Sequence, residues 1–403
     1  MKLELQKNID YIMKEFYPIG ASTEGGVTRL GYSEVEDQMH NKFLEMAKSF
    51  GLNTEVDEVG NSYAYLGEFD KYHLMGSHLD SVINAGRYDG IVGVAVGLAV
   101  MKLLVEQGKT IPVKTVAFRC EESANFMSAL MGSGLISGLT KFDDVKNLKG
   151  LDGITLEEIF TERGYSHNPK TIDGVIDYTE LHIEQGRVLE ENNNEIGIVN
   201  VIAGGIKILG EVDGMAEHAG ATPMDLRIDS LAAVAEIILE VEKLASTETE
   251  TSVGTVGFIE NHPNAMNVVP GVTKFSVDLR DIHNESMNIL KEKVVKSIEK
   301  ICKKRNLSYR IEITGKTPAA HLSSRMIKEF EEIAKKDNYK YQIMPSGASH
   351  DCLKMNELFE SVLIFIPCKG GISHNPLEYA SVENMALGGE IILKYLLKKN
   401  QLL

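Results

Sequence analysis

The amino-acid sequence predicts an α/β fold with a mainly parallel sheet, interrupted by an inserted domain of ferredoxin-like β-α-β-β-α-β order. Three observations predict it. Strand-like and helix-like runs alternate towards both ends of the chain, the middle changes to a different order, and 403 residues exceed what one hydrophobic core usually serves. We expect residues 1–206 and 320–403 to form one discontinuous domain, and residues 207–319 to form the inserted one.

Apolar spacing predicts the elements of the first part of the chain. Residues 37–50 have helical spacing that stops at Gly51, whereas residues 91–107 are apolar on most faces, which predicts a buried helix. The apolar run 72–76 and the β-rich run 112–119 predict strands. Because such alternation is typical of parallel sheets, we expect the chemistry to gather at the C-terminal ends of the strands.

The middle of the chain gives the inserted domain its predicted order. The expected elements are strand 206–212, helix 228–244, strands 253–259 and 272–279, helix 286–304 and strand 308–313. After residue 320 the chain returns to α/β character and should complete the first domain.

The charge balance limits the possible partners. The net charge of −16 would repel phosphate backbones and anionic lipid, so we expect neither nucleic acid nor a membrane surface as partner. A local Arg can still bind a small acidic substrate. The longest apolar stretch, 91–105, contains Lys102 and is too short to span a bilayer.

The four cysteines are scattered, which is typical of reduced thiols and not of a disulfide framework. The first 20 residues lack an uninterrupted apolar run, so no signal peptide is expected. Together these features predict a cytoplasmic protein.

The first candidate motif is Gly76-Ser77-His78-Leu79-Asp80, followed by Arg87-Tyr88-Asp89-Gly90. His78 follows an apolar strand, and Asp80 could hold its imidazole in the orientation that a metal ligand needs. Asp89 precedes a predicted helix, whose N-terminus favours a carboxylate. The alternative interpretation is an Asp-Gly turn beside a solvated His.

The second motif is the pair Glu121-Glu122, directly after the predicted strand 112–119. One carboxylate could bind a metal while the other accepts a proton from water. The alternative is a solvated charge pair that caps a helix. Cys120 is a poor nucleophile candidate because the neighbouring carboxylate would raise its pKa.

Two further histidines stand in conspicuous segments. In Glu180-Leu181-His182-Ile183-Glu184-Gln185-Gly186, an extended backbone would place His182 and Glu184 on one face. The Gly-rich loop Gly370-Gly371-Ile372-Ser373-His374-Asn375-Pro376 carries the other histidine, with Glu378 four residues beyond it. The alternatives are an exposed strand edge and an ordinary turn. Together the motifs supply a ligand set suited to two divalent ions that share one carboxylate.

In chain order, these segments resemble the M20-type metallohydrolases, and within them the N-carbamoyl-L-amino-acid hydrolase and allantoate amidohydrolase branch. The resemblance covers nearly the whole chain. It rests on GSHLDSV, GRYDG, the Glu121-Glu122 pair, LHIEQG, EHAGATPM, NVVPG, VDLRD, PSGASHD and GISHNP. HIEQG and EHAGATPM together are much more specific than a lone H-x-D.

The resemblance implies a role for each of these residues. Asp89 would bridge the two ions, Glu121 would be the general base, and Asp80 would be the orienting carboxylate. The implied metal ligands are His78, Asp89, Glu122, His182 and His374. The implied substrate contacts are Gln185, His218, Asn267, Arg280, Gly347 and Ala348.

The resemblance also implies a lid and a homodimer formed through the inserted domain, with His218 reaching the neighbouring subunit's site. The chemistry of the side chains agrees, since His218 and Asn267 could donate hydrogen bonds to a developing oxyanion. Arg280 offers a planar fork for a substrate carboxylate, although a surface salt bridge with Asp278 or Asp281 is the alternative.

Three positions depart from the family pattern. Asn125 stands where the family has Arg, Ser349 where it has Gly, and Cys352 where it has Ala. These changes leave the metal set intact and bear on the substrate, because Asn125 and Ser349 are expected beside its side chain.

We therefore expect a metal-dependent amidohydrolase that cleaves the C–N bond of an N-carbamoyl L-amino acid or an allantoate-like substrate. Two divalent ions would activate a water whose proton Glu121 takes, with zinc as the first expectation and manganese, cobalt or nickel as alternatives. Two other interpretations stay open: an aminoacylase or dipeptidase of the same family that acts on N-acyl amino acids, and a non-catalytic binding protein on this fold.

Overall fold

The computed structural model describes residues 1–402, which divide into two compact units. The first unit contains Met1–Asn200 and the C-terminal segment that begins at Leu322. The second unit is the segment Val201–His321. Each unit has its own cluster of buried apolar side chains.

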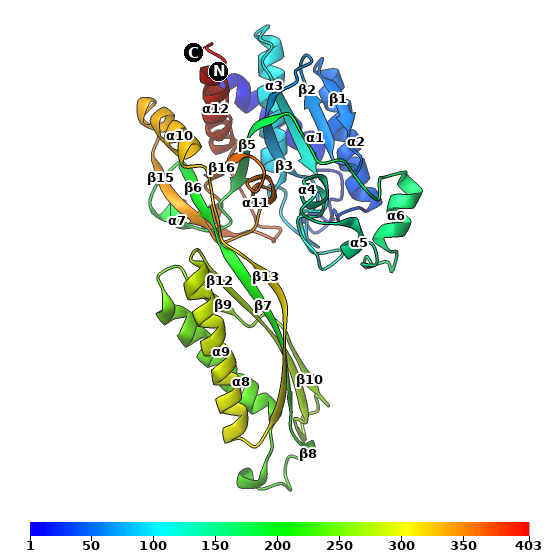
Figure 1. The fold of residues 1–403 in the computed structure, drawn as a ribbon, viewed down its shortest axis with the longest axis vertical. Helices are drawn as coiled ribbons and strands as arrows, with labels where there is room; N and C mark the ends of the chain where they lie inside the picture. The colour runs from blue at the N-terminus through cyan, green and yellow to red at the C-terminus, as the bar shows by residue number, and fades with distance from the viewer. Residues whose placement is uncertain (403) are drawn as a thin grey trace. The chain divides into compact units, whose positions relative to one another are not determined.

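The centre of the first unit is a sheet that belongs to a nine-stranded path of order β1-β2-β4-β3-β5-β16-β6-β14, with β15 also paired to β6 (Figure 1). The last strand of this path, β14, and the final two residues of β6 fall within the segment Val201–His321. The strands of the path are β1 (Asn53–Val56), β2 (Ser62–Tyr65), β3 (Tyr72–His78), β4 (Val113–Phe118), β5 (Val175–Ile183), β6 (Ile196–Ile202), β14 (Ala320–His321), β15 (Tyr341–Ser346) and β16 (Glu360–Ile366).

The expectation of a mainly parallel sheet is correct only for the centre. Strands β4, β3, β5 and β16 run parallel to their neighbours in that group, whereas β1, β2, β6 and β14 pair antiparallel. At one edge the reason is the short turn Asp57–Asn61, closed by an Asp57 N–H bond to the Asn61 carbonyl of 3.0 Å. A turn this short can join only antiparallel neighbours.

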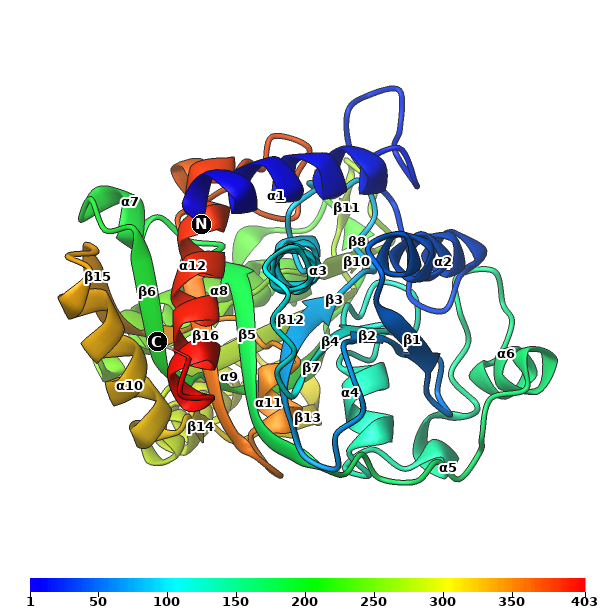
Figure 2. The ribbon, with the colours of Figure 1, turned by 90° about the horizontal axis from the view of Figure 1, so that it is seen from above.

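The longer helices of the first unit share one apolar core with the sheet. Helices α1, α3 and α12 lie side by side (Figure 2). The helices that contribute to this core are α1 (Lys2–Phe16), α2 (Glu34–Ser49), α3 (Ile91–Glu106), α10 (Ser324–Lys336) and α12 (Val382–Lys399). The shorter helices are α4 (Met131–Ile136), α5 (Phe142–Val145), α6 (Leu156–Arg163), α7 (Val188–Glu191) and α11 (Cys352–Met355), with a 3-10 turn at Lys369–Gly371.

Two of these helices follow directly from local sequence. Helix α2 begins three residues earlier than expected because the Ser33 hydroxyl accepts the Glu36 N–H and caps the first turn. Helix α3 is buried along almost its whole length, as its run of Gly, Ala and Val predicts.

The second unit is built on a five-stranded antiparallel sheet of order β10-β12-β7-β13, with β9 also paired to β12. Helices α8 (Ser230–Glu248) and α9 (Asn284–Lys304) lie side by side against it (Figure 1). The strands are β7 (Gly204–Asp213), β9 (Val253–Thr255), β10 (Ile259–His262), β12 (Val272–Asp281) and β13 (Ser308–Thr317). A separate ladder joins β8 (Glu217–His218) to β11 (Val268–Val269), and a 3-10 turn lies at Met224–Leu226.

The core of this unit reflects a period of two along its strands. In β7, Ile206, Ile208 and Val212 are buried while Lys207 and Leu209 between them are exposed. The buried side packs against apolar residues of α8 and α9.

One expected strand, 253–259, is instead two. The chain advances from Thr255 to Ile259 while its partner β12 recedes only from Asp278 to Phe275. The segment from β9 to β10 therefore contains one residue more than the stretch of β12 that it faces, and such an insertion interrupts the ladder.

Within residues 1–402, no helix combines the length and the apolar character that crossing a bilayer requires.

Candidate metal centre

The parallel part of the sheet brings the sequence motifs to one edge. His78 is the last residue of β3, and His182 is the last but one of β5. Glu121 and Glu122 follow the end of β4, and the loop after β16 carries His374. Because these four strands run in the same direction, their C-terminal ends meet at a common edge.

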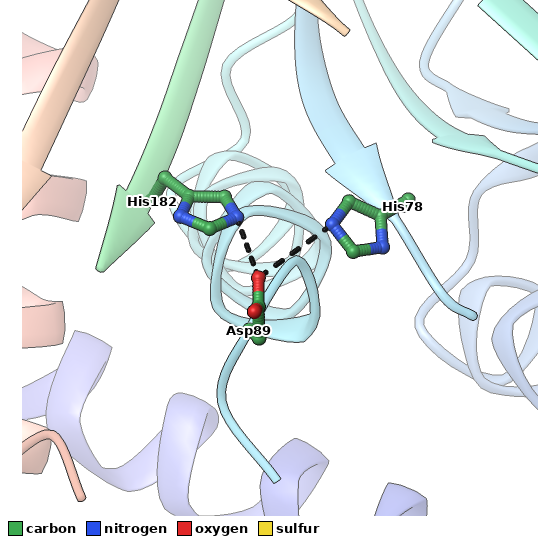
Figure 3. A group of neighbouring side chains, drawn as sticks. All are labelled: His78, Asp89 and His182. Carbon is green, nitrogen blue, oxygen red and sulfur yellow. Dashed lines mark ion pairs between the residues drawn. The ribbon is translucent and has the colours of Figure 1, made fainter. Parts of the chain in front are cut away.

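Asp89 lies at the centre of the cluster. Its Oδ1 is 3.0 Å from His182 Nε2 and 3.7 Å from His78 Nε2, and Figure 3 shows both imidazoles directed at this carboxylate. Its Oδ2 is 3.0 Å from His374 Nε2, which in turn lies 3.1 Å from Glu122 Oε1. Each oxygen of Asp89 therefore faces its own set of side chains.

These side chains form two overlapping groups suited to a cation. The first comprises His78, Asp89 and His182, and the second Asp89, Glu122 and His374; within each group the ligand atoms lie within 4.8 Å of one another. Imidazole and carboxylate donors suit Zn²⁺ and related divalent ions. Asp89 belongs to both groups.

The hydrogen bonds of the two buried imidazoles test whether a cation fits. His182 Nδ1 lies 2.8 Å from the Ile183 carbonyl, and His78 Nδ1 lies 3.2 Å from the Asp80 carbonyl. Carbonyl oxygens only accept, so both Nδ1 atoms carry hydrogen. In the neutral imidazoles Nε2 then carries a lone pair on the side of the Asp89 carboxylate, and His182 Nε2 also accepts the Gly90 N–H at 3.1 Å. A lone pair that faces a carboxylate oxygen is unfavourable unless a proton or a cation lies between them, and a divalent cation bound by both atoms meets this need.

The electrostatics of the cluster point the same way. Burial alone would lower the pKa of His78, but the Asp80, Glu121 and Asp89 carboxylates hold it well above its usual value. Hydrogen bonds to Asp89 and Glu122 raise the pKa of His374 to about 10. Burial alone would raise the pKa of Asp89, yet the surrounding imidazoles hold it well below its usual range. The site is thus organised around positive charge.

Asp80 does more than orient His78. Its two carboxylate oxygens accept the backbone N–H groups of Glu121 and Glu122, each at 3.0 Å. Its Oδ1 also lies 3.3 Å from His78 Nδ1. One buried carboxylate therefore fixes both the imidazole of β3 and the start of the loop after β4.

Glu121 lies beside the cluster but in neither ligand group. Its Oε2 is 3.8 Å from His78 Nε2, and the residue is buried. Burial raises its pKa well above the usual value, and the neighbouring carboxylates of Glu122, Asp351 and Asp80 add to this despite the opposing effect of His78. A carboxylate of raised pKa is a stronger base, which suits proton transfer.

A second buried network supports the same loop. Glu36 Oε1 accepts the Cys120 N–H at 2.8 Å, and Glu36 Oε2 binds Arg119 Nη1 at 2.9 Å. The Cys120 thiol is fully buried, and burial is the main cause that raises its pKa, followed by Asp80 and Glu36. The expected direction of this shift is correct, although burial outweighs the neighbouring carboxylate.

The expected substrate residues of the first unit have distinct environments. Gln185, in a left-handed backbone conformation, donates from Nε2 to Asp89 Oδ2 at 2.8 Å. Gly347 and Ala348 lie on the loop after β15, where the Ser346 hydroxyl donates to the Ala348 carbonyl at 2.8 Å. Asn125 is buried and joins two loops, since its amide donates to the Gly31 carbonyl and accepts the Leu151 N–H.

The remaining expected residues lie in the second unit. His218 lies on β8 and pairs with Val268 of β11. Asn267 directly precedes β11, and its carbonyl accepts the Ala219 N–H at 2.9 Å. Arg280, on β12, is partly exposed and pairs with Asp278 at 3.0 Å, so the salt bridge that the sequence left open is present.

Two residues of the cluster were not assigned a role from sequence. Glu378 accepts the N–H groups of Tyr88 and Asp89, and Ser373 lies between Glu378 and Asp89. In the sequence, Ser373 directly precedes His374 and Glu378 follows it by four residues, and this proximity is the only local indication of their role.

The three imidazoles and the shared aspartate at the strand ends of this mixed α/β sheet form a candidate divalent-metal centre of the kind that metal-dependent hydrolases use. The chain belongs to peptidase family M20/M25/M40, whose model matches residues 74–398. The predicted membership in the M20-type family is confirmed.

The similarity extends over nearly the entire chain. This chain is 35% identical to an N-carbamoyl-L-amino acid amidohydrolase of Geobacillus stearothermophilus, over 94% of its own length and 95% of the relative's. It is 33% identical to an allantoate amidohydrolase of Bacillus subtilis, over 98% of both chains. The crystal structure of an amidase of the hydantoinase/carbamoylase family from Burkholderia multivorans superposes with a TM-score of 0.89 at 28% identity, covering 98% of this chain and 97% of the other.

Proposed function

We propose that this chain is a two-metal amidohydrolase that cleaves the C–N bond of an N-carbamoyl L-amino acid or an allantoate-like ureido substrate. The observation that carries the proposal is Asp89, whose two oxygens face two separate groups of ligand side chains beside the buried Glu121. The names of the relatives from Geobacillus stearothermophilus and Bacillus subtilis support the substrate class.

In this proposal His78, Asp89 and His182 hold one divalent ion, and Asp89, Glu122 and His374 hold the other. Bound divalent ions supply Lewis acidity, which lowers the pKa of a water and polarises a carbonyl. The donor set suits zinc, and manganese, cobalt or nickel can occupy the same ligands.

Glu121 is the proposed general base. It takes a proton from the attacking water as the water adds to the ureido carbonyl carbon, and it delivers that proton to the leaving nitrogen. For an N-carbamoyl amino acid the products are the free amino acid, ammonia and carbon dioxide. The Asp80 carboxylate keeps Glu121 in place by accepting the Glu121 backbone N–H.

His218 and Asn267 are proposed to stabilise the oxyanion. His218 Nδ1 accepts the N–H groups of Gly220 and Ala221, both at 3.1 Å, which leaves the ring hydrogen on Nε2. The imidazole is exposed, so its Nε2–H can donate to a substrate oxygen. Arg280 offers its guanidinium to the substrate carboxylate, and Gln185, Gly347 and Ala348 complete the proposed contacts.

We further propose that the Val201–His321 unit is the inserted ferredoxin-like domain expected at residues 207–319, and that it acts as lid and homodimer interface. Its strand and helix order supports this proposal. The four free, buried thiols fit a reducing compartment, which supports a cytoplasmic location.

A substrate screen tests the proposal. Metal-free protein is reloaded separately with Zn²⁺, Mn²⁺, Co²⁺ or Ni²⁺ and assayed for ammonia release from N-carbamoyl L-amino acids and allantoate, and for amine release from N-acetyl amino acids. We expect ammonia release from a ureido substrate with at least one metal. Turnover of N-acetyl amino acids alone would assign the chain to aminoacylases instead.

The base is tested by Glu121→Gln. The change removes the proton acceptor but keeps the volume, so kcat should fall about 100- to 10,000-fold while bound metal stays unchanged. Glu383→Gln, an exposed carboxylate on α12, is the matched control and should leave kcat unchanged. A near-normal kcat for Glu121→Gln would refute the assignment.

A further inference from the structure

A buried carboxylate outside both ligand groups joins the two segments that carry them. Glu378 is 3% exposed and stands four residues after His374. Its Oε1 accepts the backbone N–H groups of Tyr88 at 2.8 Å and of Asp89 at 3.1 Å. Its Oε2 lies 2.9 Å from the Ser373 hydroxyl. Glu378 therefore contacts the backbone of the shared aspartate and the neighbour of His374.

Ser373 has two acceptors within reach and only one hydrogen to give. Its Oγ lies 2.9 Å from Glu378 Oε2 and 3.1 Å from Asp89 Oδ2. A hydroxyl carries a single donor hydrogen, so it bonds to one of these oxygens at a time.

Metal binding depends on whether the Ser373 hydroxyl donates to Glu378 or to Asp89, because Asp89 can accept only a limited number of bonds. A carboxylate oxygen has about two lone pairs. One lone pair of Asp89 Oδ2 accepts the Gln185 amide at 2.8 Å. If the Ser373 hydroxyl took the other, Oδ2 would have none left for a cation held with Glu122 and His374.

We propose that Glu378 is a positioning residue that keeps the Ser373 hydrogen away from Asp89 and so leaves Oδ2 free to bind the second ion. This inference rests on the proposed metal centre. Glu378 acts through Ser373 and through the Asp89 backbone, without touching the ion or the substrate.

The surrounding chain is shaped to admit this carboxylate. A Cβ atom at Gly86 would lie 2.3 Å from both Cβ and Oε1 of Glu378, closer than real atoms approach. The segment before Asp89 therefore leaves space that only the glycine provides.

A double-mutant cycle on the full-length protein tests the inference. In Glu378→Gln, Oε1 still accepts the two N–H groups, but the new amide donates to Ser373 Oγ. The hydroxyl hydrogen then turns to Asp89. In Ser373→Ala that hydrogen is gone, so the double variant Ser373→Ala/Glu378→Gln should regain the affinity for the second ion that Glu378→Gln loses.

Metal-free protein is titrated with Zn²⁺ by calorimetry, and bound zinc is counted by elemental analysis after dialysis. We expect two ions for the wild type and a weaker second ion, by about 10- to 100-fold, for Glu378→Gln. The double variant should regain most of that affinity. Glu383→Gln is the matched control, and circular dichroism of the metal-free proteins monitors folding.

Two results would overturn the inference. One is wild-type zinc affinity in Glu378→Gln, and the other is a double variant as weak as that single variant. Because zinc is titrated without substrate, a wild type that binds two ions but hydrolyses no ureido compound would refute the proposed activity and leave this inference standing. A wild type that binds no zinc would overturn both.

Discussion

Gly86 approaches the side chain of Glu378 so closely that a Cβ atom on the glycine would lie 2.3 Å from the glutamate Cβ. The backbone of Gly86 lies outside the left-handed region, so the constraint is space and not conformation. Glu378 in turn holds the N–H groups of Tyr88 and Asp89. Through Glu378, Gly86 therefore affects the geometry of the site proposed for the two metal ions.

Gly86→Ala should therefore weaken metal binding without contacting a ligand. The added methyl group displaces Glu378, and such overpacking costs about 1–3 kcal/mol of the free energy of unfolding. We expect reduced affinity for the second Zn²⁺ in a titration of metal-free protein. Gly257→Ala adds the same methyl group where no atom lies within 4 Å and is the control. Equal zinc affinity in the two variants would show that this contact does not matter.

Asp80→Asn should lower activity through the glutamate pair. The amide can accept one N–H group but not both, so either Glu121 or Glu122 loses its anchor. We expect kcat to fall by about 10- to 100-fold, as is typical for a residue that orients a metal site. Steady-state kinetics and zinc content check this, with the exposed Asp70→Asn as the matched control. Unchanged kcat in Asp80→Asn would contradict it.

Removal of metal should both inactivate and destabilise the protein. Without a cation, imidazole lone pairs face the Asp89 carboxylate, and only protonation relieves this. A ligand that binds only the folded state stabilises it by about 2.7 kcal/mol at a free concentration 100 times its dissociation constant. Urea unfolding before and after chelation measures the difference, and restored zinc should reverse it. Identical unfolding curves would argue against metal bound at this cluster.

The sequence predicted the parts of the centre that depend on strand order. His78, Glu121, Glu122 and His182 each stand at or just after a parallel strand, so their meeting follows from topology alone. The antiparallel edges of the sheet were missed because apolar alternation does not show which strands pair.

The supporting contacts could not be predicted for a different reason. Glu378 and Tyr88 are bonded across 290 residues of chain, and nothing in either local sequence specifies a partner at that separation. The double role of Asp80 depends on the backbone direction after β4, which is a property of the folded chain. The extra residue between Thr255 and Ile259 likewise becomes visible only in the register of the ladder.

A carboxylate at the end of β12 should make the stability of the second unit depend on pH. Asp281 is buried and accepts hydrogen bonds from the hydroxyls of Thr249, Thr251, Ser252 and Ser286 and from the His283 N–H. Burial alone would raise the pKa of this carboxyl, but the hydrogen bonds lower it from 3.8 to about 2.

The direction of the effect follows from the lowered pKa. The folded state holds its proton less tightly than the unfolded state, so the stabilisation is fully present above about pH 4 and is lost as the pH falls towards 2. A shift of this size corresponds to about 2 kcal/mol. Asp281→Asn should therefore lower the free energy of unfolding at pH 7 by at least about that amount, and the difference from the wild type should shrink between pH 4 and pH 2. Urea unfolding at each pH measures it, with the exposed Asp225→Asn as control. A difference that stays constant down to pH 2 would mean that the carboxylate charge contributes nothing.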